Sequence, residues 1–144
     1  MNYVNSNKFI TGKNAYTVFD AIAAINKAIK ENRPFIFTKY RSSIIGFLAC
    51  MRDNNYIYNY EIITFGMASK YIKVYFKYYH SLAPFRYIEI LSRPGRYLSI
   101  TALQLKRLVY RTNLTYIINT SHGYIHHSEA LALKSGGFLM CKII

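Results

Sequence analysis

Three histidines near the end of the sequence are the residues whose type most directly suggests metal chemistry: His122, His126 and His127. Two histidines four residues apart can share a zinc ion when they lie on one face of a helix. Here Gly123 and the Tyr124-Ile125 pair between them predict a turn and a strand instead. No cysteine or acidic pair stands nearby to complete a ligand set. We therefore expect no metal site and no cofactor.

The candidates for covalent or acid–base catalysis are equally isolated. Cys50 falls in the apolar part of a predicted helix, where a thiol is usually inert packing. Ser121 and His122 are adjacent, but adjacency in sequence is not the geometry of a catalytic triad. Gly136-Gly137 lacks the Lys-Ser/Thr pair of a phosphate-binding loop. The sequence thus favours a protein that is not an enzyme and has no small-molecule substrate.

The charge balance points to a polyanionic partner. The 144 residues include 19 Lys and Arg but only 6 Asp and Glu, a formal net charge of +13. At 52% hydrophobic residues, with 15 Tyr and 9 Phe, the chain is expected to fold. Two cysteines exclude a disulfide-built domain. We expect no membrane span, because no apolar run approaches about 20 residues. We also expect no targeting peptide, because residues 1–13 have neither an apolar core nor an Arg/Ser-rich amphipathic pattern. Nucleic acid is the first candidate partner, and an anionic membrane surface the second.

Two polar turns carry the groups that could contact RNA. Asn119-Thr120-Ser121, followed by His122-Gly123, offers an amide and two hydroxyls in one turn. The segment Ser92-Arg93-Pro94-Gly95-Arg96 places two guanidiniums around a Pro-Gly bend, and arginine binds phosphate bidentately. Either turn alone is a common kind of sequence, since such residues dominate turns everywhere.

The elements that must position these turns follow from hydrophobic periodicity. A helix capped by Asn14 is predicted from the apolar stripe Val18, Ile22, Ile25 and Ile29, and it ends before Pro34. Further predicted elements of the first half are a buried strand at 35–38, a helix from Ser42 or Ser43 to Asp53, and strands at 56–65 and 71–79 around a hairpin loop at 66–69.

The strand at 71–79 has the clearest alternation. Ile72, Val74, Phe76 and Tyr78 should share one face, and an aromatic–lysine ladder the other: Tyr71, Lys73, Tyr75, Lys77 and Tyr79. Such a ladder could stack bases and contact phosphates. It could equally be a solvated sheet face whose tyrosines suit strands.

The second half is predicted to be rich in strands. Predicted strands lie at 87–91, 97–100, 114–118, 124–126 and 138–144, with a helix capped by Thr101 and a short helix at 128–134. We therefore expect an α+β fold: an N-terminal α-β-α-β-β domain (14–82) packed against a β-rich C-terminal domain with short helices (83–144), after an extension at 1–13.

The order and spacing of the turn motifs resemble ribosomal protein S8 of the small subunit. The resemblance rests on Ser92-Arg93-Pro94-Gly95, then 119–123, then Glu129-Ala130, then Gly136-Gly137, then a terminal strand with Cys141. It extends more loosely through the first half, over about residues 15–144. The family implies a structural rRNA-binding protein that binds a stem in the central domain of small-subunit rRNA and assembles beside neighbouring ribosomal proteins.

We expect rRNA contacts from the two turns, as the resemblance implies, and from further basic and small residues. The candidates are the two turns, the basic and small residues before the last strand, and the start of the second helix: Ser92, Arg93, Pro94, Gly95, Arg96, Asn119, Thr120, Ser121, His122, Gly123, Lys134, Gly136, Gly137, Lys39, Arg41 and Ser42.

Several positions depart from the family pattern. Asn119 replaces the first serine of the family's loop, His122 replaces its lysine, and Phe138 replaces a glutamate. The chain is also rich in Phe, Tyr, Ile, Asn and Lys, whose codons are A/T-rich. Together these features favour a mitochondrial ribosome, and a plastid less so. The alternative is a free-standing basic RNA-binding module, for instance an RNA chaperone, or a membrane-surface protein.

Overall fold

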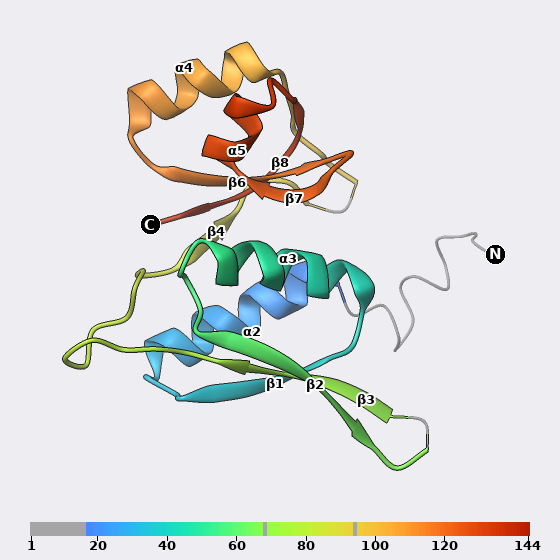
Figure 1. Ribbon diagram of the computed structural model, residues 1–144. Coiled ribbons are helices and arrows are strands. Elements are labelled where there is room, and N and C mark those ends of the chain that lie inside the picture. Colours follow the sequence, from blue (N-terminus) through green and yellow to red (C-terminus); the bar gives the residue numbers. More distant parts are fainter. Residues whose placement is uncertain (1–16, 68, 94) are drawn as a thin grey trace.

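The computed structural model describes residues 17–67, 69–93 and 95–144, which form four alternating layers of sheet and helix (Figure 1). A three-stranded sheet lies at one end, and the helices α2 (Val18–Lys30) and α3 (Ser42–Asp53) cover one of its faces. A second sheet lies against those helices, and α4 (Ala102–Thr112) and α5 (His127–Ala132) cover its far side. The expected α+β class is confirmed.

The first sheet contains β1 (Phe35–Lys39), β2 (Asn59–Phe65) and β3 (Ser69–Tyr75) in the antiparallel order β1-β3-β2. Ile36, Ile72 and Val74 point toward the helices and are buried, as the alternation predicts. The expectation of a buried strand at 35–38 is only half right, because Phe35 and Phe37 lie exposed on the opposite face.

Helix α2 begins later than the sequence suggests. Its N-cap is Thr17, whose amide donates a hydrogen bond to the Asp20 carboxylate at 2.8 Å. An acidic side chain in the first turn also suits the positive end of the helix dipole. The predicted cap Asn14 and the extension at 1–13 lie outside the described residues.

The second sheet has the order β4-β8-β6-β7, and β5 pairs with β8 outside that path. Its strands are β4 (Ile88–Ile90), β5 (Ser99–Ile100), β6 (Thr115–Thr120), β7 (Gly123–His126) and β8 (Gly137–Ile143). Thr101 caps α4 as predicted, by accepting a hydrogen bond from the Gln104 amide at 3.2 Å.

Among the described residues, the larger of two hydrophobic clusters is shared between the halves of the chain. Ile25 and Phe47 of the first half pack there with Ile117, Met140 and Cys141 of the second. A smaller cluster around Leu105 and Ile118 lies beneath α4 and α5. Burial of the Cys50 side chain raises its pKa to about 12, so this thiol is protonated at neutral pH.

Candidate nucleic-acid interface

The turn between β6 and β7 is shorter than the predicted one. Asn119 and Thr120 end β6, Gly123 begins β7, and Ser121 and His122 alone form the turn. The Thr120 hydroxyl donates to the Gly123 carbonyl at 3.1 Å and accepts from the His122 amide at 3.0 Å. This hydroxyl therefore holds the turn together, whereas Ser121 and His122 are exposed.

The turn between Arg93 and Arg96 is closed by two backbone hydrogen bonds. Each amide donates to the other residue's carbonyl, at 3.0 and 2.8 Å, and both side chains are exposed. Gly95 has φ +82°, a conformation that favours glycine. Pro94 lies outside the described residues. The paired backbone of Arg93 and Arg96 thus keeps two exposed arginines close together.

Ser92 does not lie on the surface with these arginines. It is buried, and its hydroxyl donates to the Leu139 carbonyl at 2.6 Å and accepts from the Leu98 amide at 3.0 Å. We expected this side chain to face RNA. Its burial instead makes it the residue that ties the arginine turn to β8.

The glycine pair before β8 is explained by close backbone contact. A Cβ on Gly136 would lie 2.6 Å from the Ile100 carbonyl oxygen, and one on Gly137 would collide with the Asn119 carbonyl. Only glycine lets the chain pass between the end of β5 and the end of β6. Lys134, two residues earlier, is exposed with φ +52°.

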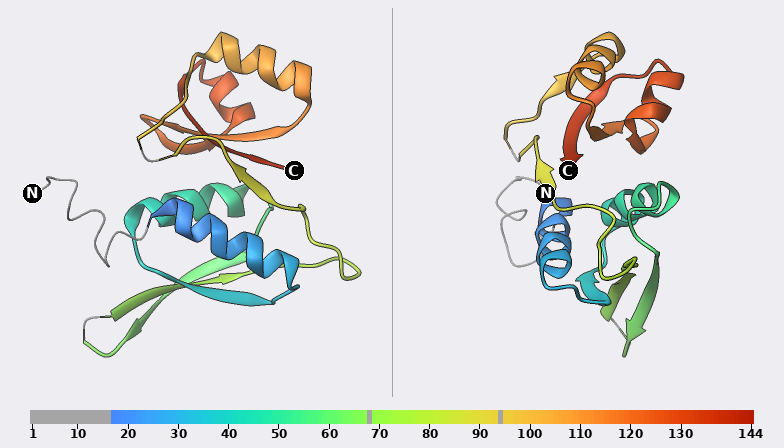
Figure 2. Two further views of the ribbon diagram at one scale, coloured as in Figure 1. Left: turned by 180° about the vertical axis from the view of Figure 1, so that it is seen from behind. Right: turned by 90° about the vertical axis from the view of Figure 1, so that its left-hand side faces the viewer.

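These segments converge at one end of the second sheet. Phe138 of β8 pairs with Ser99 on one side and with Asn119 on the other, and its ring lies 5.4 Å from the Tyr97 ring. The turn at 121–122 and residues 95–96 lie toward the same side of the molecule in opposite views (Figures 1 and 2). The two turns and the start of β8 therefore lie at the same end of this sheet, whereas Ser92 is buried beneath it.

Helix α3 brings Ser42 toward the same side. Tyr124 packs on Phe47 near the start of α3, with ring centroids 5.7 Å apart, and His126 stacks on Tyr56 just beyond its end. Helix α3 and β7 therefore run in the same direction, so Ser42 lies on the side of the β6–β7 turn. Arg41 directly precedes Ser42, and both are exposed. Lys39, the last residue of β1, lies one layer further away.

Exposed cations on α4 extend the basic character of the C-terminal half: Lys106, Arg107 and Arg111. Hydrophobic periodicity predicts these three cations on the polar face of this helix, in the half of the chain expected to face RNA, although they are not among the candidate contacts named above.

His126 and His127 are half-buried, and both side chains are neutral at neutral pH. Burial, and then the charge of His127, lower the pKa of His126 to about 4, and burial also lowers the pKa of His127.

No group of three potential metal ligands occurs among the described residues. Within the same part of the chain, no helix is long and apolar enough to cross a bilayer.

Comparison with known proteins gives a consistent match over nearly the whole chain. The family model described as Ribosomal protein S8 matches residues 16–144. The small ribosomal subunit protein uS8 of Dictyoglomus thermophilum is 27% identical over 126 residues, covering 88% of this chain and 95% of the relative. The uS8 protein of Bartonella henselae is 24% identical over 124 residues, covering 86% and 93%.

Proposed function

Because the chain belongs to the ribosomal protein S8 family, whose members are structural rather than catalytic, we propose that it is a structural protein of the small ribosomal subunit that binds rRNA. The observation that carries this proposal is the convergence of the two turns, the glycine pair and the start of α3 on one side of the molecule.

The groups on this side suit an RNA helix. A-form RNA is recognised mainly through its backbone and the 2′-hydroxyls of its shallow minor groove. Arg93 and Arg96 can contact phosphates, and the exposed Ser121 hydroxyl can donate to or accept from a ribose hydroxyl. The two-residue turn that carries Ser121 is narrow enough to enter such a groove.

We further propose that the target is a stem in the central domain of small-subunit rRNA, beside neighbouring small-subunit ribosomal proteins, in a mitochondrial ribosome. Support for the stem comes from the ordered motifs shared with the family. Support for the mitochondrion comes from the A/T-rich residue bias and from the substitutions Asn119, His122 and Phe138 in otherwise family-like segments.

Binding to the cognate rRNA stem tests the site directly. We expect Arg93→Gln with Arg96→Gln to weaken binding and to lower the slope of log affinity against log salt by about one for each phosphate that the variant no longer neutralises. The matched control is Lys27→Gln with Lys30→Gln, which removes the same charge from α2. Equal effects of the two pairs would argue for non-specific electrostatics.

Sedimentation separates a ribosomal protein from a free-standing RNA-binding module. A subunit protein should migrate with small subunits in a sucrose gradient of organelle lysate and stay with them after a salt wash. Migration at the top of the gradient would favour an RNA chaperone and contradict the proposal.

A further inference from the structure

The three-stranded sheet has one face that no other described element covers. Helices α2 and α3 lie on the opposite face, as the front view in Figure 1 and the back view in Figure 2 show. The strand register places Phe35 and Phe37 of β1, Phe65 of β2 and Tyr71 of β3 together on the uncovered face. The three phenylalanines are 40%, 47% and 53% exposed.

These rings form a continuous platform across the strands. The Phe35 and Phe37 centroids are 5.7 Å apart, Phe37 lies 6.5 Å from Phe65, and Phe65 lies 5.6 Å from Tyr71. Neighbouring rings meet edge to face, and each of the three phenylalanines stays partly exposed to a ligand. An exposed aromatic run of this kind on a monomer usually marks an interaction site.

A lysine lies within the platform. The Lys73 ammonium is 4.2 Å from the Phe35 centroid, 5.0 Å from that of Tyr75 and 5.6 Å from that of Phe37. Each distance is within the range of a cation–π contact. The ammonium has three donors, so it can keep these ring contacts and still bind an oxygen anion.

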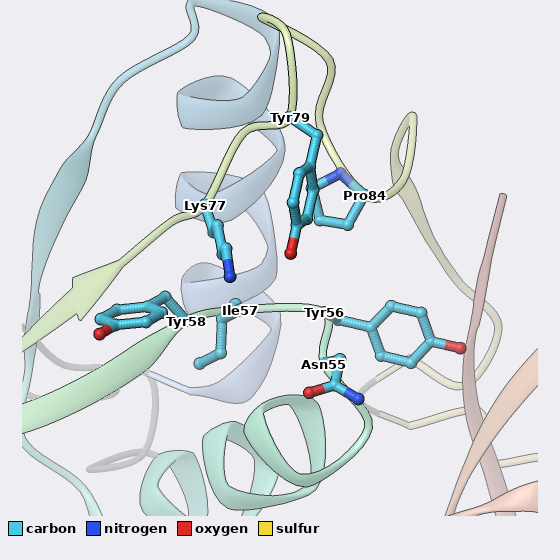
Figure 3. Close-up of a pocket in the computed structure, with 7 residues that line it drawn as sticks. All are labelled: Asn55, Tyr56, Ile57, Tyr58, Lys77, Tyr79 and Pro84. Atoms are coloured by element: carbon cyan, nitrogen blue, oxygen red, sulfur yellow. The ribbon is translucent and has the colours of Figure 1, made fainter.

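The same pattern continues beyond the end of β3, where a pocket opens (Figure 3). The Lys77 ammonium lies 4.9 Å from the Tyr79 ring and 5.9 Å from the Tyr58 ring, and both tyrosines are exposed. The cavity measures about 280 Å³ and is lined by Tyr56, Tyr58, Lys77 and Tyr79 among others. The Tyr58 amide donates to the Tyr75 carbonyl, so the pocket adjoins the platform.

The charges on this face decide which partner it suits. The core of a protein–protein interface is depleted of lysine, and burying the Lys73 ammonium there would require a paired carboxylate. Among the described residues of this sheet face, the one carboxylate is Glu61, which already accepts a hydrogen bond from the Tyr75 hydroxyl at 2.5 Å. A partner with both flat rings and negative charges could stack on the aromatic side chains and pair with the lysines at the same time.

We propose that this face binds a single-stranded RNA segment, separately from the stem contacted by the C-terminal turns. Bases stack on Phe35, Phe37 and Phe65, phosphates contact Lys73 and Lys77, and an unstacked base enters the pocket between Tyr58 and Tyr79. Stacking on aromatic side chains beside cations is how proteins hold single strands without sequence preference.

The test measures binding of the full chain to a fluorescently labelled single-stranded RNA of about a dozen nucleotides. Phe35→Ala with Phe37→Ala should weaken binding by about five-fold or more for each ring that stacks a base. Lys73→Gln should reduce the salt dependence of binding. The matched control is Tyr110→Ala, which removes a 90% exposed ring from α4. Circular dichroism verifies that each variant is folded.

A stem RNA, measured in parallel, keeps this proposal distinct from the function proposed above. The Phe35/Phe37 pair should leave stem binding unchanged, and the Arg93/Arg96 pair should leave single-strand binding largely unchanged. If the Phe35/Phe37 pair binds single strands as the native chain does, the proposal is wrong. It is also wrong if that pair abolishes a crosslink to another ribosomal protein while single-strand binding persists, because the face would then be a protein interface.

Discussion

The His126 ring lies nearly parallel to the Tyr56 ring, with centroids 6.3 Å apart, and its Nε2 is 3.4 Å from the Tyr56 hydroxyl. Tyr56 follows α3 and His126 ends β7, so this pair joins the two halves of the chain. His126 Nδ1 also accepts a hydrogen bond from the Ser128 amide at the start of α5. Protonation at Nδ1 would remove the acceptor for the Ser128 amide, whereas Nε2 would keep the proton that it directs at the Tyr56 hydroxyl.

Stability should therefore depend on pH through His126. Burial lowers its folded-state pKa to about 4, whereas an unfolded histidine titrates near 6.5. As pH falls from about 6.5 toward 4, the unfolded chain gains a proton that the folded protein does not, so the free energy of unfolding decreases. Below about pH 4 both states are protonated and this loss stops growing. Thermal melts across this range should show the decrease.

The matched variants for this prediction are His126→Gln and His122→Gln. The first should remove part of the pH dependence, with the half-buried His127 supplying the remainder, and the second replaces an exposed histidine of the β6–β7 turn as the control. An unchanged profile in His126→Gln would contradict the assignment.

Ser92→Ala should destabilise the protein by about 1–3 kcal/mol, because it removes a buried hydroxyl that bonds the Leu139 carbonyl and the Leu98 amide. Chemical denaturation measures the loss. Ser99→Ala, at an exposed position in β5, serves as the control. If Ser92→Ala keeps full stability but loses stem binding, this serine has the RNA-facing role that the sequence suggested.

Thr120→Ala and Ser121→Ala should separate folding from binding. Thr120→Ala removes both side-chain hydrogen bonds of the turn and should cost about 0.5–1.5 kcal/mol. Ser121→Ala should change stability by less than about 0.5 kcal/mol and still weaken stem binding. Denaturation and stem-binding assays on both variants check this; the reverse pattern would exchange the two roles.

Substitution by alanine should change the free energy of unfolding in opposite directions at Gly136 and Gly46. Gly136→Ala places a Cβ 2.6 Å from the Ile100 carbonyl oxygen and should cost about 1–3 kcal/mol. Gly46→Ala meets the Tyr124 ring at 3.5 Å, an ordinary contact, and gains helix propensity in α3, so it should stabilise by about 0.5–1 kcal/mol. Melting temperatures of the two variants give the comparison.

Much of the fold follows from local pattern. The stripe of α2, the extent of α3 and the alternation in β3 are set by burial at fixed periods, and the structure confirms them. The start of α2 was misplaced because the Thr17–Asp20 pairing competes with an equally plausible asparagine nearby. Positions of the turns were predictable from their Gly, Pro and Asn content.

The roles of individual site residues were less accessible. Ser92 is buried by a strand that lies 47 positions away in sequence, and no local signal indicates that pairing. The Gly136-Gly137 pair resembles a flexible loop in the sequence, whereas in the fold it is a steric requirement set by Ile100 and Asn119. Such roles depend on contacts between distant segments, which one sequence does not encode locally.

The shared hydrophobic cluster has a consequence for how the protein matures during its own translation. Helices α2 and α3 leave the exit tunnel of the translating ribosome first, yet the cluster that buries them includes Met140, Cys141 and Ile143 of β8, which is synthesised after every other described element. Until β8 emerges, the apolar side chains of α2 and α3 lack the β8 residues that bury them in the folded protein. The packing of β8 against α2 and α3 is therefore a late step of folding. The whole RNA-facing side can form only after β8 has been synthesised.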